Sequence, residues 1–546
     1  VCSSDLSIIG GEAVTFIKEG AGTLTVGGTM DVETLALREG TIVLNGASNT
    51  LDALTLEGGG LTVNGNAEVG TITGTEAGGT LAIQGTLDLT GTSSINNGAI
   101  TGTGSLRIRE GAELALGGEA RLDGTSVTAD GTLTLTGTES GAISGLSGSG
   151  ALSMNGGRLS ISSATTSSGT FSGTLAGRGA LKVSGGMQTL AGTGNADYTI
   201  EVFNGTLLLE HSSGTVSYGA ITVGDQGRLT LGSTGTPNCR LELGSGGLAV
   251  QSGGTLTINL DAATMDQLTA LMPVIQSQGN ISLEDGATVV THNLNAMTTS
   301  EMEHLSLTLF TSTEGTATLG EVTLQDDILS SMYNDLRLEV VGSSIILTGT
   351  ARQDNVFAAS AETFNSTSGA NLLWGGRFNL GVDSQLKTLY NAVLSLQSSG
   401  DRAGASRAMA AAAGSTVNAL GTAQRDALRD QMGWIRNRTT LMGVNPAYVN
   451  DDLPRFHMWM EGTGSYAKLD TRGDESGYQL TTWGGTVGVD ADLSDRLTVG
   501  AAFTAGYGDL TASAADSADG HLDSYYASLF GRYQNKRWAH TLILTG

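Results

Sequence analysis

Apolar and small polar residues alternate in short runs along the first half of the chain, and a glycine–threonine pair introduces many of these runs. Examples between about residues 20 and 260 are Gly22–Val26, Gly79–Ile83, Gly131–Leu135, Gly205–Leu209 and Gly254–Ile258. Alternation with a period of two, bounded by Gly, Asn or Ser, predicts short strands. Such strands cannot each bury an apolar face alone. Stacking them coil upon coil predicts a right-handed parallel β-helix for most of 20–260.

The apolar positions of these runs are the expected core of the β-helix. We expect the following side chains to point inward: Leu24, Val26, Leu133, Leu135, Leu229, Leu231, Leu256 and Ile258. Glycine is expected at the corners, because it adopts positive φ without a steric penalty. An antiparallel sandwich is the rival fold. The parallel helix is preferred because the repeated runs contain no obvious Asn-Gly or Asp-Gly hairpin series.

The pattern changes near residue 261. Helical spacing covers 261–275, and longer strands with fewer glycines follow over 281–350, which we interpret as a β-rich C-terminal cap of the solenoid. An amphipathic helix is predicted over 382–398 and an alanine-rich helix over 402–438. The second helix carries six arginines and two aspartates, a net charge of +4. Its small and polar residues favour a confined, wet enclosure, with an exposed linker helix as the alternative.

The last hundred residues alternate over longer segments joined by turns, which is typical of membrane β-strands. The expected strands are 455–469, 478–492, 496–510, 521–534 and 537–546. Val487 and Phe503 fall on the lipid-facing side of this pattern, and Thr486 and Asp490 on the opposite side. Aromatic residues near the strand ends are expected to form lipid-interface girdles: Trp459, Tyr466, Tyr478, Trp483, Tyr507, Tyr525, Tyr533 and Trp538. Five strands cannot close a transmembrane barrel, which needs at least about eight.

Composition and charge narrow the functional classes. The chain has 82 Gly and only 4 Pro, which argues against collagen. Residues 1–350 hold 34 acidic and 11 basic residues, a net charge of −23, which argues against nucleic-acid binding and suits a soluble surface rod. Two cysteines allow no disulfide framework, and no apolar run is long enough for a transmembrane helix. Residues 1–6 are interpreted as a non-native scar on an internal fragment.

Several peptides in 400–546, together with the order of the parts, resemble the translocator of monomeric autotransporters of type V secretion. These peptides are Ala410–Ser415, Gln424–Met432, Met458–Tyr466, Gly484–Asp490 and Val499–Ala502. The resemblance implies an all-β passenger followed by an incomplete outer-membrane antiparallel barrel. The implied domains are a passenger over 1–260, a cap or autochaperone-like region over 261–350, an α-helical linker over 351–450 and the N-terminal part of the barrel over 451–546.

The resemblance also implies a function. The barrel is expected in outer-membrane lipid, placed there by the barrel-assembly machinery, with the passenger exposed at the cell surface. The helix at 402–438 is expected to thread the barrel lumen, with these arginines facing the polar wall: Arg425, Arg429, Arg436 and Arg438. The passenger is expected to be adhesive or structural and to meet a host or bacterial surface ligand. The alternative is an enzymatic passenger, glycan-cleaving or hydrolytic.

We predict no catalytic, cofactor or metal site. The chain contains no G-x-S-x-G peptide, and His211, His292 and His304 lack metal-ligand spacing. Arg472, Gly473 and Asp474 form a candidate adhesion tripeptide, which the resemblance places in an outer loop between the first two barrel strands. Chance occurrence in a polar turn is the alternative for this tripeptide.

Overall fold

The computed structural model describes most of the chain. The described residues are 6–137, 141–163, 169–211, 215–232, 240–260, 268, 271–293, 304–326, 328–377, 384–441, 455–471, 476–513, 518–535 and 537–545. They form two compact units, the first ending at Gln353 and the second made by Asp354–Arg377 and Asp383–Gly546. Within the described residues, no helix combines the length and the apolar character needed to cross a membrane.

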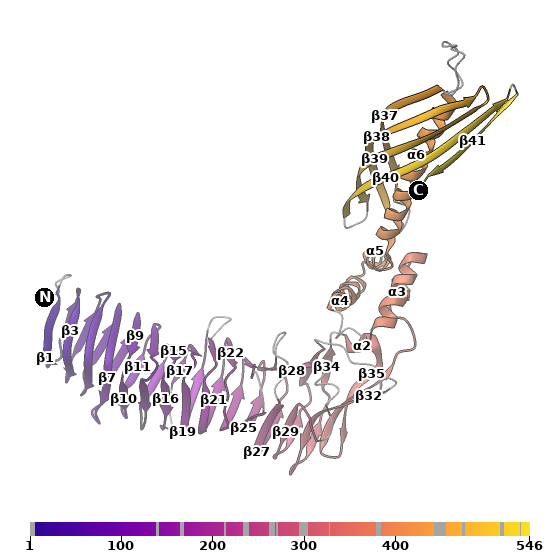
Figure 1. Cartoon of the computed structure of the whole chain (residues 1–546). Helices are drawn as coiled ribbons and strands as arrows, with labels where there is room; N and C mark the ends of the chain where they lie inside the picture. Colours follow the sequence, from indigo (N-terminus) through magenta and orange to yellow (C-terminus); the bar gives the residue numbers. More distant parts are fainter. Residues whose placement is uncertain are drawn as a thin grey trace. The chain divides into compact units, whose positions relative to one another are not determined.

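The first unit is a parallel β-solenoid, whose strands stack in chain order (Figure 1). One wall is made by two shorter sheets of parallel strands. The first contains β2 (Thr23–Val26), β4 (Thr41–Leu44), β6 (Gly60–Val63), β8 (Thr80–Ile83), β11 (Ala99–Thr101) and β14 (Arg121–Asp123). The second contains β20 (Gly169–Phe171), β22 (Met187–Leu190), β24 (Thr206–Leu209), β26 (Arg228–Leu231), β28 (Thr255–Leu260), β31 (Thr288–Asn293) and β34 (Thr323–Asp326).

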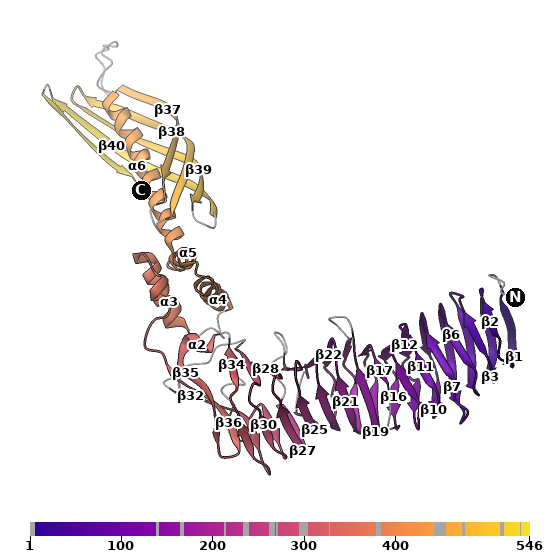
Figure 2. The same ribbon diagram turned by 180° about the vertical axis from the view of Figure 1, so that it is seen from behind.

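A long, bent sheet forms the remaining walls. Its strands are β1 (Ile8–Lys18), β3 (Met30–Leu37), β5 (Asn49–Leu56), β7 (Asn66–Gly74), β9 (Thr86–Leu89), β10 (Thr92–Ile95), β12 (Ser105–Ile108), β13 (Glu113–Leu116), β15 (Ser126–Ala129), β16 (Thr132–Leu135), β17 (Ala142–Ile143), β18 (Gly145–Ser147), β19 (Ala151–Ile161), β21 (Thr174–Val183), β23 (Ala196–Val202), β25 (Thr215–Val223), β27 (Arg240–Val250), β29 (Ile275–Ser277), β30 (Ile281–Leu283), β32 (His304–Ser312), β33 (Ala317–Leu319), β35 (Tyr333–Val341) and β36 (Ser344–Ala351). Seen from behind, the strands keep the same order (Figure 2).

The core of the solenoid consists of columns of aliphatic side chains, one from each coil. Val26, Leu44, Val63 and Ile83 lie against one another in register, and each is 0 % exposed. Seven of the eight residues expected to point inward are buried, which confirms that prediction. Leu24, on the end strand β2 of its sheet, is only half-buried.

Glycine has a second role that the sequence pattern did not indicate. A Cβ built on Gly65 would lie 1.9 Å from the carbonyl oxygen of Gly46, and one on Gly85 would lie 1.9 Å from that of Gly65. Neither residue has positive φ. Some corner glycines do adopt positive φ, such as Gly40 at +70°. In the stacked column, however, the close approach of successive coils excludes any side chain, so the corner explanation was incomplete.

Coil length increases toward the C-terminal end of the solenoid. Thr23 pairs with Thr41, 18 residues later, and Thr41 with Gly60, 19 residues later. Farther along, Thr255 pairs with Thr288, so that coil takes 33 residues. Parallel pairing continues beyond residue 260 into β34, so the coils extend well into the region interpreted as a cap. The expected helix at 261–275 falls largely outside the described residues.

The solenoid ends where the direction of strand pairing reverses. β36 pairs antiparallel with β32 on one side and with β35 on the other. The short helix α2 (Leu329–Met332) precedes β35 and buries Leu329 and Met332. Two antiparallel strands with a buried helical turn therefore close the last coil, which removes an open parallel edge.

Helices begin the second unit. They are η1 (Ala358–Ser360), α3 (Phe364–Gly376), α4 (Ser384–Ser398), α5 (Arg402–Ala412) and α6 (Ser415–Leu441). The sequence pattern missed α3, which a capping box between Thr363 and Ser366 initiates. The single helix predicted over 402–438 is two helices, because the chain turns at Gly414, where φ is +83°. α6 packs against the following sheet.

That sheet has five antiparallel strands in chain order: β37 (Arg455–Leu469), β38 (Gly477–Ser494), β39 (Leu497–Ser513), β40 (Ala518–Asn535) and β41 (Trp538–Thr545). The predicted strands match them to within three residues at each end. α6 lies against one face of the sheet in both views (Figures 1 and 2). The sheet is consistent with part of a barrel, and we call the face that α6 covers its inner face.

Candidate functional site

The two faces of the C-terminal sheet have opposite character. The outer face exposes large apolar side chains: Met458, Met460, Trp483, Val487, Val489, Phe503, Leu529, Leu542 and Leu544. The inner face buries Thr486, Asp490 and Thr504, and the hydroxyl groups of Thr486 and Thr504 lie 2.8 Å apart. An apolar exposed face opposite a covered face that contains these polar groups is typical of a membrane barrel wall.

Two of the aromatic residues expected in the lipid girdles lie instead on the inner face. Tyr478 is 2 % exposed and packs against α6. Trp459 packs against the pair of Ile435 and Phe530. The alternation of the strand indicates the inner position of Trp459. Successive side chains of a strand point to opposite faces, and the neighbours Met458 and Met460 are exposed. Tyr466, Trp483, Tyr525, Tyr533 and Trp538 are exposed as expected.

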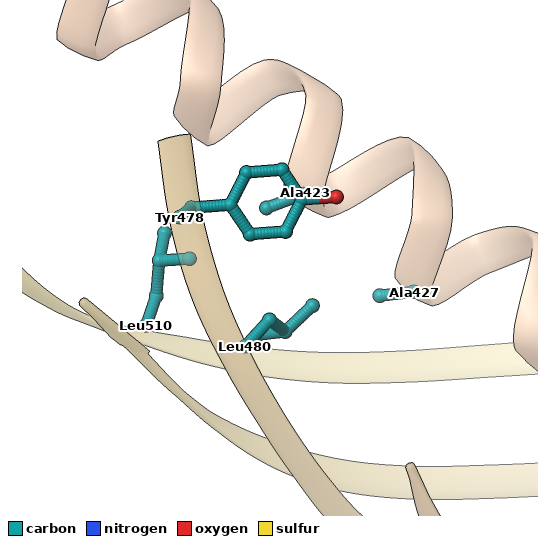
Figure 3. Packing of buried hydrophobic residues seen from close by; sticks show 5 residues of the cluster. All are labelled: Ala423, Ala427, Tyr478, Leu480 and Leu510. Carbon is teal, nitrogen blue, oxygen red and sulfur yellow. The ribbon is translucent and has the colours of Figure 1, made fainter. Parts of the chain in front are cut away.

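Small residues let the first half of α6 approach the sheet closely. Ala423 and Ala427 pack against Tyr478, Leu480 and Leu510, and all five residues are buried (Figure 3). Each alanine is short, so the helix backbone lies close to the aromatic ring. The Tyr478 hydroxyl donates a hydrogen bond to the carboxylate of Asp426 on the same helix. This contact fixes the rotation of α6 about its axis.

A charged contact holds the second half of α6. The Asp490 side chain is only 2 % exposed, and its Oδ2 lies 3.6 Å from Nη2 of Arg438. His457 from β37 places Nδ1 3.0 Å from Oδ1 of Asp490. The Arg438 guanidinium also lies over the Trp459 ring, 5.3 Å from its centre. A carboxylate with so little solvent needs such partners, because an unpaired buried charge costs several kcal/mol.

The four arginines singled out from the sequence therefore have different positions. Arg438 meets the inner wall at Asp490. Arg425 donates to the hydroxyl of Thr422 at 3.1 Å, and Arg429 lies 3.7 Å from Asp426, both within α6. Arg436 is exposed. The tripeptide Arg472, Gly473 and Asp474 lies outside the described residues.

The buried histidine of the solenoid has a structural environment. His211 contacts the carbonyl oxygen of Gly192 through Nδ1 and the hydroxyl of Tyr218 through Nε2, the latter at 3.0 Å. Burial lowers the pKa of His211, so the neutral imidazole is favoured. In the described part of the chain, no three His, Cys, Asp or Glu side chains group closely enough to hold a metal ion.

These features define a class of protein: a β-solenoid carried by an outer-membrane strand domain whose polar inner face holds a helix. Residues 458–546 match the family of the autotransporter beta-domain. Neither the characterised proteins nor the solved structures include a significant match to the chain. The autotransporter beta-domain at 458–546 and the β-solenoid before it fit an autotransporter, with a β-helical passenger exposed at the cell surface and a barrel domain in the outer membrane.

Proposed function

We propose that the passenger is an adhesive or structural rod rather than an enzyme, and that it meets a ligand on a host or bacterial surface. The observation that carries this proposal is the pairing of outward polar side chains from one coil to the next. Side chains committed to neighbouring coils stiffen the rod and are unavailable for chemistry. An extended, stiff body suits the presentation of a binding surface away from the membrane.

The pairing recurs along the solenoid. Arg38 binds Glu19 on the preceding coil at 2.6 Å and Glu57 on the following coil at 3.0 Å. Asn64 donates to Asn45 at 2.7 Å. Each exposed ion pair stabilises by only about 0–1 kcal/mol. Repetition along the stack, rather than any single contact, therefore provides the stiffness.

For secretion, we infer that α6 occupies the lumen of the complete barrel. A helix with several arginines cannot face lipid, where a central charge costs about 2.5–3.5 kcal/mol even on insertion scales. The contacts of Arg438 with Asp490 and of Asp426 with Tyr478 support a position against the polar wall. We also propose that the barrel-assembly machinery inserts the barrel. During export, the capped end of the passenger, up to Ala351, folds first.

Surface attachment tests the proposed role of the passenger. Cells displaying the full-length protein should attach to one another, to host cells or to a coated surface more strongly than cells displaying the barrel without residues 20–350. Surface proteolysis confirms display in both strains. Hydrolysis of a polysaccharide or peptide by the displayed passenger, without any gain in attachment, would instead establish the enzymatic alternative.

A further inference from the structure

A hollow of about 520 Å³ lies on the outer side of the long sheet of the solenoid. It spans the starts of β23, β25, β27 and β29, close to the point where the coils lengthen. Its walls are mainly carboxylate, amide and hydroxyl side chains, contributed by Asn195, Asp197, Ser217, Glu242, Gln276 and Glu314. Tyr218 and Ser277 line its buried floor.

Strand register arranges part of this lining in a row across successive coils. Asn195 pairs with Ser217, Ser217 with Glu242, and Glu242 with Gln276. Neighbouring strands lie about 4.7–4.9 Å apart, so each coil contributes one polar group per strand spacing. That interval is comparable with the length of one sugar residue in an extended polysaccharide.

The row differs from other outward rows of the solenoid because its side chains are not used within the fold. No hydrogen bond joins the side chains of Asn195, Ser217, Glu242 or Gln276 to other described residues. Elsewhere such residues pair between coils, as Gln84 does with Thr103 at 3.0 Å. The Thr311 hydroxyl, on the coil after Gln276, lies 2.9 Å from that of Ser344. The row is therefore followed, on the next coil, by a side chain that is already paired.

The lining selects among ligand chemistries. Amides and hydroxyls both donate and accept hydrogen bonds, and carboxylates accept them, which together match the hydroxyl groups of a sugar. Among the described residues that line the hollow there is no lysine or arginine, and Glu242 and Glu314 would repel an acidic glycan. The uncharged amide and hydroxyl side chains outnumber the carboxylates in this lining, which favours a neutral ligand over a cationic peptide. Asp197 already pairs with Arg178 at 2.7 Å, so its carboxylate adds little negative charge to the hollow.

We propose that this hollow binds a neutral, extended polysaccharide lying along the solenoid axis, with Glu242 and Gln276 as its central contacts. The inference rests on the proposed adhesive function and specifies the ligand class. The lining residues that the structure describes offer no exposed aromatic ring on which a sugar could stack. Binding at one hollow is therefore weak, and many copies on one cell supply the avidity.

Binding by cells that display the full-length protein tests the proposal. The probes are immobilised oligomers of glucose, mannose, galactose and N-acetylglucosamine, with heparin and oligolysine as charged alternatives. The test variant is Glu242→Ala/Gln276→Ala. The matched control is Glu201→Ala/Gln251→Ala, which removes the same residue types outside the hollow. Surface proteolysis verifies that both variants are displayed and folded.

At least one neutral oligomer should bind, and the test variant should bind it about tenfold more weakly, because two sets of hydrogen bonds are lost. The control should bind as the unmodified protein does. Preference for heparin or oligolysine, equal loss in both variants, or no neutral binding would overturn the proposal. If cells displaying the test variant still attach, the hollow is not the site of attachment, and the adhesive function is unaffected. If cells displaying the unmodified protein attach no better than cells displaying the barrel alone, the adhesive function is refuted.

Discussion

The stacked glycines make a sharp prediction for Gly85→Ala. The added Cβ would lie 1.9 Å from the oxygen and 2.8 Å from the carbon of the Gly65 carbonyl. Both atoms belong to the backbone of the preceding coil, so no side chain can rotate away. The two coils must separate for the methyl group to fit. Separation strains the hydrogen bonds from Gly85 N to Val63 O and from Thr86 N to Gly65 O, each 3.0 Å long.

The expected destabilisation is about 1.5–4.5 kcal/mol, because overpacking costs about 1–3 kcal/mol and weakening a backbone hydrogen bond adds about 0.5–1.5 kcal/mol. The effect should be local, since each coil contacts only its neighbours. Gly22→Ala is the matched control. A Cβ on Gly22 has no atom within 4 Å, and its φ is not positive. That variant should change stability by less than about 0.5 kcal/mol.

Pulse proteolysis of the full-length protein over a urea series measures both variants, with cleavage sites mapped by mass spectrometry. Gly85→Ala should lower the urea midpoint for cleavage near β8 and β9 and leave that of β28 unchanged. Equal midpoints for Gly85→Ala and Gly22→Ala would refute the close-approach explanation of the glycine column. A uniform loss along the solenoid would refute the coil-by-coil description of its stability.

Three further predictions concern single contacts and regions. Arg438→Gln leaves His457 as the partner of the buried Asp490 among the ion pairs of the described residues. It should therefore lower the unfolding temperature of the assembled barrel, measured by heat-dependent gel mobility, whereas Arg407→Gln, at an exposed position of α5, should not. Burial lowers the pKa of His211 below 6.5, so passenger stability should fall as pH drops below that value, and His211→Gln should flatten the dependence in thermal denaturation at pH 5–7.5. Limited proteolysis should leave a resistant fragment containing 275–351, and protection of 20–150 instead would contradict folding from the capped end.

Alternation along the strands was sufficient to predict most of the C-terminal sheet. The period of two placed Thr486 and Asp490 on one face and Val487 on the other, as observed. The same rule would have placed Tyr478 with Asp490 on the inner face, because both have even numbers on one regular strand. Grouping Tyr478 with the lipid girdle ignored that parity in favour of its position near a strand end.

Contacts between separate elements were less accessible to sequence reasoning. The pairing of Asp426 with Tyr478 depends on the rotation of α6 and on its height along β38, and neither follows from periodicity. The register of the coils is similarly underdetermined, because many runs are nearly identical. The glycine column and the unpaired row at Glu242 become visible only when successive coils are superposed. The break at Gly414 also needed the structure, because alanine-rich sequence on both sides favours an uninterrupted helix.

Disulfide cross-linking in intact cells tests most directly whether α6 lies inside the barrel of the secreted protein. In a full-length background with Cys2 and Cys239 replaced by serine, Ala427→Cys is combined either with Leu480→Cys or with Thr481→Cys. Ala427 packs beside Leu480, whereas Thr481 is the next residue on β38 and is exposed on the opposite face. A position of α6 inside the barrel predicts that only the Leu480 pair cross-links in molecules whose passenger is on the surface. Equal cross-linking of both pairs, or cross-linking of the Thr481 pair alone, would contradict it.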